Sequence, residues 1–170
     1  MSILVADDFA DSAEAVALAL QIEGFDAFFV SSGTEALQAI SERRPTAAIL
    51  DLKMPDLDGF ELAQKIRTSP DESLRSANLI AHSGLQSPCY REQAVQSGFD
   101  YYAVKPCPIE QLTACLSLAD TGIPPKLILP TIDSEKMFAL SERSQRAVKR
   151  ARNIRATYRH LYKLLQDSSD

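Results

Sequence analysis

The chain has 170 residues, 45% apolar and 24% charged, with a net formal charge of −5, which predicts one soluble globular domain with a short appendage. No apolar run reaches the roughly 18 residues of a membrane-spanning helix, and the N-terminus lacks the features of a secretory signal. Cys89, Cys107 and Cys115 show no metal-ligand spacing, so we interpret them as reduced thiols and expect a cytoplasmic protein.

Five short apolar runs divide the first 120 residues, and a polar turn and a helical pattern follow each run. The runs are residues 3–6, 27–30, 47–50, 79–81 and 102–104. The expected helices are residues 12–23, 34–43, 60–68, 90–97 and 109–119. Short runs rich in Val, Ile, Leu and aromatic residues are typical of strands covered on both faces. Their alternation with helices predicts an α/β fold with a five-stranded, parallel, doubly wound sheet.

Local signals mark several of the expected helix ends. Asp11 and Ser32 each precede a glutamate by three residues, which is the spacing of a capping box at a helix start or a close variant of it. Gly24 and Gly98 lie just past expected helix ends, where a residue in the left-handed region closes the last turn. These signals support the helical interpretation of the segments between the apolar runs.

Polar side chains follow the apolar runs at the edge where open α/β sheets bind ligands. Asp7 and Asp8 follow the first run, Asp51 the third, Ser83 the fourth and Lys105 the fifth. At about 4 Å and an effective dielectric near 20, two carboxylates repel by about 4 kcal/mol, so three together need protons or a cation. Hard oxygen ligands suit Mg²⁺. An aspartate beside Mg²⁺, a hydroxyl and an ammonium is equipped to attack phosphorus and hold the transferred oxygens.

Residues 51–59, with the sequence Asp-Leu-Lys-Met-Pro-Asp-Leu-Asp-Gly, resemble the phosphorylation-site motif of the response-regulator receiver family, including its chemotaxis-type members. The other strand-end residues resemble the family's acidic pair, its Ser/Thr-small switch and its lysine, in the order Asp7-Asp8, Ser83-Gly84 and Lys105-Pro106. The resemblance covers about residues 2–119. It implies a five-stranded, doubly wound, flavodoxin-like receiver fold.

The resemblance implies phosphoryl transfer to Asp51 from the phosphohistidine of a histidine kinase or phosphotransfer protein. It also implies Mg²⁺ bound by Asp8, Asp51 and the backbone carbonyl of Lys53, with Asp7 supporting the metal through water. A receiver of this kind catalyses only its own phosphorylation and dephosphorylation. We therefore do not expect an enzyme that turns over a separate substrate.

By the same resemblance, Ser83 and Lys105 bond the phosphoryl oxygens, and Tyr102 turns inward behind Ser83. Gly84 leaves the phosphate approachable, and Gly59 opens the next helix. We expect phosphorylation of the site to favour one arrangement of Ser83 and Tyr102, which is a population shift.

Two other classes of protein fit the residues less well. Haloacid-dehalogenase-type phosphatases also use a strand-end aspartate, but the position two after Asp51 is Lys53, so their general acid is missing. A flavodoxin-like cofactor site needs a phosphate loop after the first strand, where Asp7 and Asp8 would repel phosphate unless a metal intervened. His82 should point away from Ser83 by strand alternation, and a phosphate role for it is not favoured.

The C-terminal part differs in composition from the predicted receiver domain at 1–120. Residues 1–120 contain 8 Lys+Arg and 18 Asp+Glu, whereas residues 121–170 contain 10 Lys+Arg and 5 Asp+Glu. Gly122 and three prolines predict an extended linker at 121–132. Residues 133–167 are predicted to form a long basic amphipathic helix, with a coiled-coil heptad seam through 137–165.

A helix of this length cannot bury its seam against one small domain, so we favour self-association or pairing with a partner helix through 137–165. A break at 141–144 is the structural alternative. Nucleic-acid contact through the basic face is less favoured, and docking on the acidic receiver is a further alternative. We expect phosphorylation to control oligomerisation or partner binding through this helix. The rival hypothesis is a constitutive scaffold or adaptor.

Overall fold

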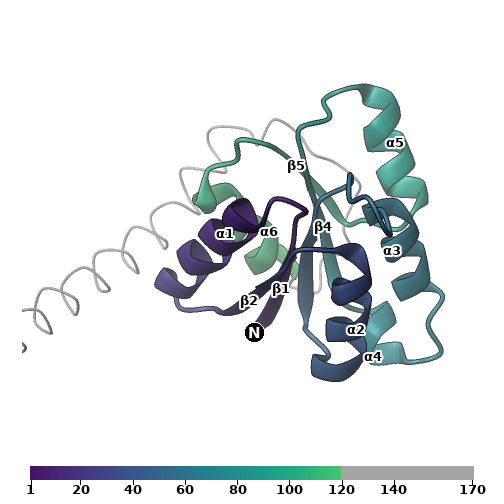
Figure 1. Ribbon diagram of the computed structural model, residues 1–170, viewed down its shortest axis with the longest axis horizontal. Coiled ribbons are helices and arrows are strands. Elements are labelled where there is room, and N and C mark those ends of the chain that lie inside the picture. Colours follow the sequence, from purple (N-terminus) through teal and green to yellow (C-terminus); the bar gives the residue numbers. More distant parts are fainter. Residues whose placement is uncertain (120–170) are drawn as a thin grey trace, which may run out of the picture. The chain divides into compact units, whose positions relative to one another are not determined.

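The computed structural model describes residues 1–119, which form a five-stranded parallel sheet with the strand order β2-β1-β3-β4-β5 (Figure 1). The strands are β1 (Ser2–Ala6), β2 (Asp26–Val30), β3 (Ala47–Leu50), β4 (Asn78–Ser83) and β5 (Tyr101–Val104). The prediction of an α/β fold with five parallel strands is confirmed. The strand order reverses between β1 and β3, and ligand sites in such sheets lie outside the carboxyl ends of the strands at this point.

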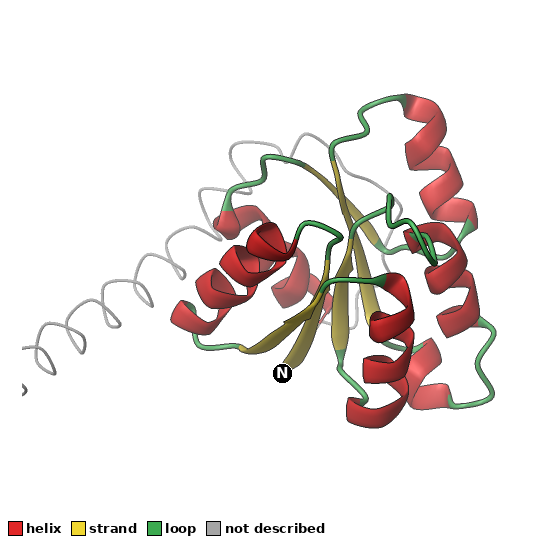
Figure 2. Ribbon diagram, viewed as in Figure 1, coloured by secondary structure: helices red, strands yellow, loops and turns green. Residues whose placement is uncertain are grey.

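Helices cover both faces of the sheet (Figures 1 and 2). They are α1 (Ala10–Ile22), α2 (Gly33–Arg43), α3 (Gly59–Arg67), α4 (Glu72–Arg75), α5 (Pro88–Gln96) and α6 (Ile109–Ala119). Helices α1 and α6 lie on one face, and α2, α3 and α5 lie on the other. This is the doubly wound arrangement that the sequence predicts.

Strand alternation divides the apolar side chains between two cores. Leu4 and Ala6 of β1 belong to the core under α2, α3 and α5, while Ile3 and Val5 belong to the core under α1 and α6. All four side chains are at most 1% exposed. Fully burying one large aliphatic side chain stabilises a fold by about 1.5–3 kcal/mol, so a strand covered on both faces is held firmly. The strand ends therefore provide a rigid base for the residues that follow them.

Most helix-end predictions are confirmed, and one is wrong. Ser32 caps α2 by accepting a hydrogen bond at 3.1 Å from the N–H three residues on. Gly24 and Gly98 have φ angles of 93° and 95°, in the left-handed region. Asp11, however, does not cap α1, because the helix begins two residues earlier than expected, at Ala10, with Phe9 at the cap position and no capping side chain. Asp11 lies instead within the first turn, where a carboxylate interacts favourably with the helix dipole.

Two further elements differ from the expected ranges. The four-residue helix α4 was not predicted, because a single turn capped by Asp71 leaves no periodic apolar pattern. Strand β4 extends to Ser83, so this hydroxyl belongs to the last residue of the strand instead of following it.

The predicted linker at 121–132 and the predicted helix at 133–167 lie outside the described residues. The seam through 137–165 and the break at 141–144 lie there too, so they stay predictions, as does the domain boundary at residue 120. Within residues 1–119, no helix has both the length and the apolar character needed to cross a membrane.

Arg67, at the end of α3, holds the amino-terminal edge of the sheet together. Its Nε donates to the Gly98 carbonyl at 2.8 Å, and its Nη1 donates to the carbonyls of Arg75 and Ala77 at 2.6 and 2.8 Å. Its Nη2 donates to Asp100 at 2.7 Å, and Asp100 also accepts a bond from the backbone of β4 at 2.7 Å. One planar cation thus joins the end of α3 to two segments, residues 75–77 before β4 and residues 98–100 before β5.

Candidate functional site

The site lies at the carboxyl edge of the sheet, where Asp7 follows β1 and Asp51 follows β3. Ala6 of β1 pairs with Leu50 of β3, and the Asp51 N–H donates to the Ala6 carbonyl at 2.8 Å. The next residues on the two neighbouring strands are Asp7 and Asp51, so their side chains leave the sheet at the same level. The prediction that these carboxylates meet at one edge agrees with this register.

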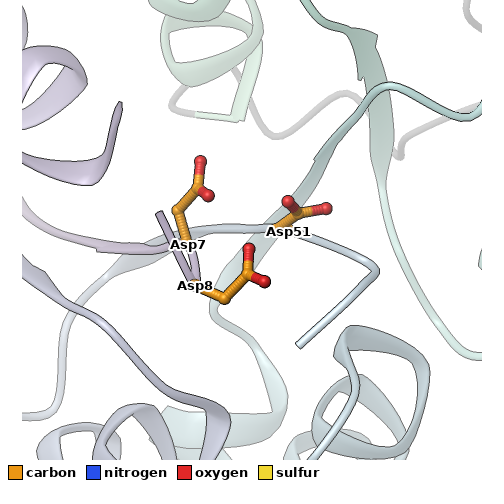
Figure 3. Close-up of side chains that lie close together, drawn as sticks. All are labelled: Asp7, Asp8 and Asp51. Atoms are coloured by element: carbon orange, nitrogen blue, oxygen red, sulfur yellow. The ribbon is translucent and has the colours of Figure 1, made fainter. Parts of the chain in front are cut away.

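Asp7, Asp8 and Asp51 form a compact acidic cluster (Figure 3). Each offers a carboxylate oxygen, and these oxygens lie within 4.8 Å of one another. Asp7 is 3% exposed and Asp51 is 8% exposed, whereas Asp8 is exposed to solvent. The cluster therefore has a buried floor of two carboxylates and an open third position.

Among residues 1–119, Lys105 is the only lysine or arginine that forms an ion pair with this cluster. Its Nζ donates to Asp7 Oδ2 at 2.7 Å and to Asp51 Oδ2 at 2.6 Å. Burial lowers the pKa of Lys105, but the hydrogen bonds to Asp51 and Asp7 raise it further, so its net pKa lies above the ordinary value. The ammonium therefore stays charged at neutral pH between the two buried carboxylates.

Asp7 is fixed by two further hydrogen bonds. Its Oδ1 accepts from the Phe9 N–H at 3.1 Å, and its Oδ2 accepts from the Ser12 hydroxyl at 2.8 Å. Burial alone raises the pKa of Asp7, but the bonds from Lys105, Ser12 and Phe9 outweigh it, so the pKa is lowered. Ser12 was not predicted as part of the site. Its position five residues after Asp7, in the first turn of a helix, is the only sequence signal for it.

The loop between β3 and α3 wraps closely around Asp51. Asp51 Oδ1 accepts a hydrogen bond from the Lys53 N–H at 3.1 Å. A Cβ on Gly59 would overlap the backbone carbonyl of Asp51, so glycine is required at the start of α3. Asp58 caps that helix by accepting the Glu61 N–H at 2.8 Å. The backbone of Lys53 thus lies beside the cluster, and its carbonyl stays a predicted metal ligand.

Asp56 fastens the same loop to the start of α2. Its two carboxylate oxygens accept the N–H groups of Gly33 and Thr34 at 3.1 and 2.8 Å. Hydrogen bonds with Thr34 are the largest cause that lowers the pKa of Asp56. A Cβ on Gly33 would overlap the Leu57 carbonyl, which shows how closely the loop and helix pack. Sequence reasoning missed this anchor, because it joins segments 22 and 23 residues apart.

Ser83 and Tyr102 both contact the backbone of Leu85, on the other side of Asp51. Ser83 is 2% exposed, and its hydroxyl accepts a long contact from the Leu85 N–H at 3.5 Å. Tyr102 is 5% exposed, and its hydroxyl donates to the Leu85 carbonyl at 2.6 Å. The Arg91 guanidinium lies 5.7 Å from the centre of the Tyr102 ring. Sequence reasoning missed both Leu85 and Arg91.

Gly84 and the surrounding cleft leave the site open on this side. A Cβ on Gly84 would meet no atom within 4 Å, so the backbone there faces open space. A cleft of about 490 Å³ extends from Asp8 and Lys53 to the apolar side chains of Met54 and Leu85. An incoming group can therefore approach the cluster between the β3–α3 loop and the start of α5.

The doubly wound sheet, the acidic cluster and the bridging lysine are together typical of a receiver domain. The sequence model of the family described as response regulator receiver domain matches residues 3–117. The chain belongs to this family, the receiver domains of two-component response regulators.

Curated relatives agree with this assignment. Response regulator MprA of Mycobacterium avium (strain 104) is 32% identical over 114 residues, which cover 67% of this chain and 48% of that protein. DNA-binding response regulator MtrA of Mycobacterium leprae (strain TN) is 34% identical over 112 residues, covering 66% and 48%. The chain spans about half the length of the curated relatives it matches.

Solved structures share the fold. The Francisella response regulator 1452 receiver domain is 28% identical with a TM-score of 0.63, covering 71% of this chain and 97% of that one. A DNA-binding response regulator of the LuxR family from Staphylococcus aureus is 26% identical with a TM-score of 0.63, covering 70% and 98%.

Proposed function

We propose that this receiver belongs to a phosphorelay in which Asp51 accepts a phosphoryl group from the phosphohistidine of a histidine kinase or phosphotransfer protein. The observation that carries the proposal is the position of Lys105, whose ammonium bonds Asp7 at 2.7 Å and Asp51 at 2.6 Å beside Asp8. A cation held by the acceptor carboxylate puts positive charge where the phosphoryl oxygens arrive. Such preorganised charge is the main source of catalysis in phosphoryl transfer.

Mg²⁺ fits the donor set of the acidic cluster. The three residues offer carboxylate oxygens within 4.8 Å of one another, and Mg²⁺ prefers a few hard oxygen ligands together with water and phosphate. Asp8, Asp51 and the carbonyl of Lys53 would hold the ion, and Asp7 would act through water because its oxygens already accept three hydrogen bonds. When bound, Mg²⁺ supplies charge neutralisation for the acceptor and the phosphoryl oxygens.

In the proposed reaction, a carboxylate oxygen of Asp51 attacks phosphorus. The bond between phosphorus and the donor's imidazole nitrogen breaks, and its electron pair returns to the imidazole. The Lys105 ammonium then donates a hydrogen bond to a phosphoryl oxygen, and the Ser83 hydroxyl donates one to another. Attack by water later releases inorganic phosphate and restores the Asp51 carboxylate. The chain would therefore catalyse only its own phosphorylation and dephosphorylation.

The proposed switch runs through Leu85. Ser83 Oγ has only a 3.5 Å contact with the Leu85 N–H, so its reorientation toward a phosphoryl oxygen costs little. The Leu85 carbonyl accepts a hydrogen bond from the Tyr102 hydroxyl at 2.6 Å, so a shift of the Leu85 backbone would change the support of the buried ring. Phosphorylation would thus favour one arrangement of Ser83 and Tyr102 and reshape the surface formed by α5, β5 and α6.

The proposed output is control of oligomerisation or partner binding through residues 137–165, which lie outside the described residues. A second candidate is binding of nucleic acid by the basic segment. Residues 121–170 carry 10 Lys+Arg against 5 Asp+Glu, and relatives such as MtrA are named DNA-binding response regulators. Their match covers only 48% of their length, so pairing through 137–165 remains the favoured proposal.

The test of phosphoacceptance is incubation of the full chain with acetyl phosphate and Mg²⁺, followed by intact mass and peptide mapping. We expect one phosphoryl group, located on Asp51 and removed by hydroxylamine. Asp51→Asn and the parent with excess chelator should both remain unlabelled, while Asp58→Asn, a matched change in the same loop, should be labelled. An unlabelled parent would favour the rival hypothesis of a constitutive scaffold or adaptor.

A further inference from the structure

His82 lies in the same cross-strand row as Asp51. Leu50 of β3 pairs with Ala81 of β4, so Asp51 and His82 are the next residues on neighbouring strands. Adjacent strands are about 4.8 Å apart, and alternation places both side chains on the face of Ile80, which belongs to the core under α1 and α6. His82 is 6% exposed. A buried imidazole therefore stands directly beside the phosphoacceptor.

The side chain of Lys105 crosses β4 at the level of this imidazole. Ala103 of β5 pairs with His82, and Lys105 comes two residues later, so it shares the same face. Its backbone N–H donates to the Ser83 carbonyl at 3.0 Å, yet its Nζ reaches Asp51 beyond β4 at 2.6 Å. The strand between them is β4, and its residue on this face and level is His82. The Lys105 side chain therefore passes over the imidazole ring of His82 on its way to Asp51.

The Nε2 atom of His82 is buried and has no hydrogen-bond partner within residues 1–119. Proteins seldom leave such an atom unpaired, because burial removes its hydrogen bonds to water and no protein hydrogen bond replaces them. His82 is not one of the groups whose ligand atoms meet within 4.8 Å, so its Nε2 is not placed to bind the same metal. A neutral imidazole has one N–H and one nitrogen lone pair, so the His82 ring is able to accept a hydrogen bond.

We propose that His82 is a positioning residue for Lys105, with its ring supporting the lysine side chain and its Nε2 accepting an ammonium hydrogen in the phosphorylated state. This inference rests on the proposed acceptance of phosphate by Asp51. The ammonium has three hydrogens, and two are donated to Asp7 and Asp51. When Asp51 becomes an acyl phosphate, its oxygen loses the charge that held the ammonium. Asp7, a phosphoryl oxygen and His82 Nε2 then provide three acceptors for the three hydrogens.

The experiment compares the full-length parent with His82→Gln, which retains a polar acceptor, and His82→Leu, which fills the space without one. Asn78→Leu is the matched control, a buried polar-to-leucine change at the far end of the same strand. The measurements are the rate of Asp51 labelling over a range of acetyl phosphate concentrations, the half-life of the phosphoryl group, and the urea midpoint. In the parent, the ¹⁵N shift of His82 Nε2 is recorded with and without beryllofluoride and Mg²⁺.

We expect His82→Leu to lower the saturating labelling rate about tenfold without lowering the urea midpoint, because a hydrogen bond to a charged group is lost. His82→Gln should recover most of the rate, Asn78→Leu should keep it, and the Nε2 shift should move on addition of beryllofluoride. Parent-like rates in His82→Leu together with an unmoved Nε2 shift would overturn the role of His82 while labelling of Asp51 stands. Absence of labelling in the parent would instead overturn the proposed function.

Discussion

The two edges of the sheet each carry a half-buried ion pair, and the pairs differ in how completely they are satisfied. At the amino edge, Arg67 donates to Asp100 and to three backbone carbonyls, so one cation meets one carboxylate and most of its donors have partners. At the carboxyl edge, Lys105 meets Asp7 and Asp51, and the carboxylate of Asp8 lies beside them. The first pair is neutral and closed, while the second keeps excess negative charge and an open face.

This difference separates a structural ion pair from a functional one. A buried pair whose geometry and hydrogen bonds are complete has no remaining capacity for a ligand, and breaking it leaves a buried charge uncompensated. An acidic cluster with too few cations retains affinity for a further cation. This difference supports our proposal that metal and phosphate bind at the carboxyl edge, although both edges use the same kinds of side chain.

The largest expected effect on stability is at the amino edge, where Arg67 bonds Asp100. Arg67→Ala leaves Asp100 buried without its cation and removes donors from three carbonyls. We expect the free energy of unfolding to fall by about 3 kcal/mol in urea titrations. Arg67→Lys should recover only part of the lost stability, because an ammonium lacks the planar set of N–H donors of a guanidinium. The folded fraction should still be labelled at the parent rate, and a fully folded but unlabelled variant would contradict the separation of the two edges.

The next effect concerns pH, through His82. Its folded pKa of about 4 lies below the ordinary 6.5, so between these values the unfolded chain binds the proton that the folded chain excludes. Stability should therefore rise with pH across this window and fall as the solution is acidified from 6.5 to 4, by at most about 3 kcal/mol. Urea titrations of the parent and His82→Gln at both ends of the window measure the difference. Equal pH dependence in the two proteins would rule out His82 as its source.

The variant Lys105→Gln removes the ammonium that bonds Asp7 and Asp51 at the carboxyl edge. Without the ammonium, Asp7 and Asp51 face each other with no bonded cation, so the chain should be less stable than the parent in chelator. Added Mg²⁺ should then raise the melting temperature of the variant more than that of the parent. Labelling by acetyl phosphate should fall about a hundredfold, because one preorganised charge is lost. A variant that Mg²⁺ stabilises no more than the parent would argue against a shared cation site.

The smallest expected effect is at Arg91, whose guanidinium lies 5.7 Å from the Tyr102 ring centre. At an exposed position such a contact contributes about 0.5–1 kcal/mol, so Arg91→Ala should change the urea midpoint only slightly. Flipping of the Tyr102 ring, measured by NMR, should become faster, while Arg91→Lys should resemble the parent more closely. An unchanged flip rate in Arg91→Ala would show that the hydroxyl bond to Leu85 alone holds the ring.

Strand-end residues could be predicted from the sequence because they depend on local pattern. Asp7, Asp51 and Lys105 each follow a short apolar run, and parallel strands bring their carboxyl ends to one edge. The structure brings these three side chains within hydrogen-bonding distance as expected. The roles of Ser83 and Tyr102 in signalling stay predictions, although both side chains are buried beside the site.

What the sequence did not reveal depends on contacts between distant segments. Asp56 bonds the start of α2, and Arg67 bonds the Gly98 carbonyl, 31 residues later in the chain. No local pattern encodes such meetings, because they exist only after the sheet has assembled. The wrong prediction that Asp11 caps α1 has a different, local cause. The side chain of Ser12 bonds Asp7 at 2.8 Å, and the helix starts earlier than its capping-box spacing indicates.

The two sides of Asp51 differ in the hydrogen bonds that hold them. The β3–α3 loop is tied to α2 by two hydrogen bonds to backbone N–H groups, at 3.1 and 2.8 Å. On the other side, Leu85 has one short hydrogen bond to a side chain, which its carbonyl accepts from Tyr102 at 2.6 Å. If Asp51 is phosphorylated as we propose, we expect the structural change to spread on this less firmly held side. The receiver would then pass its signal toward α5 and β5.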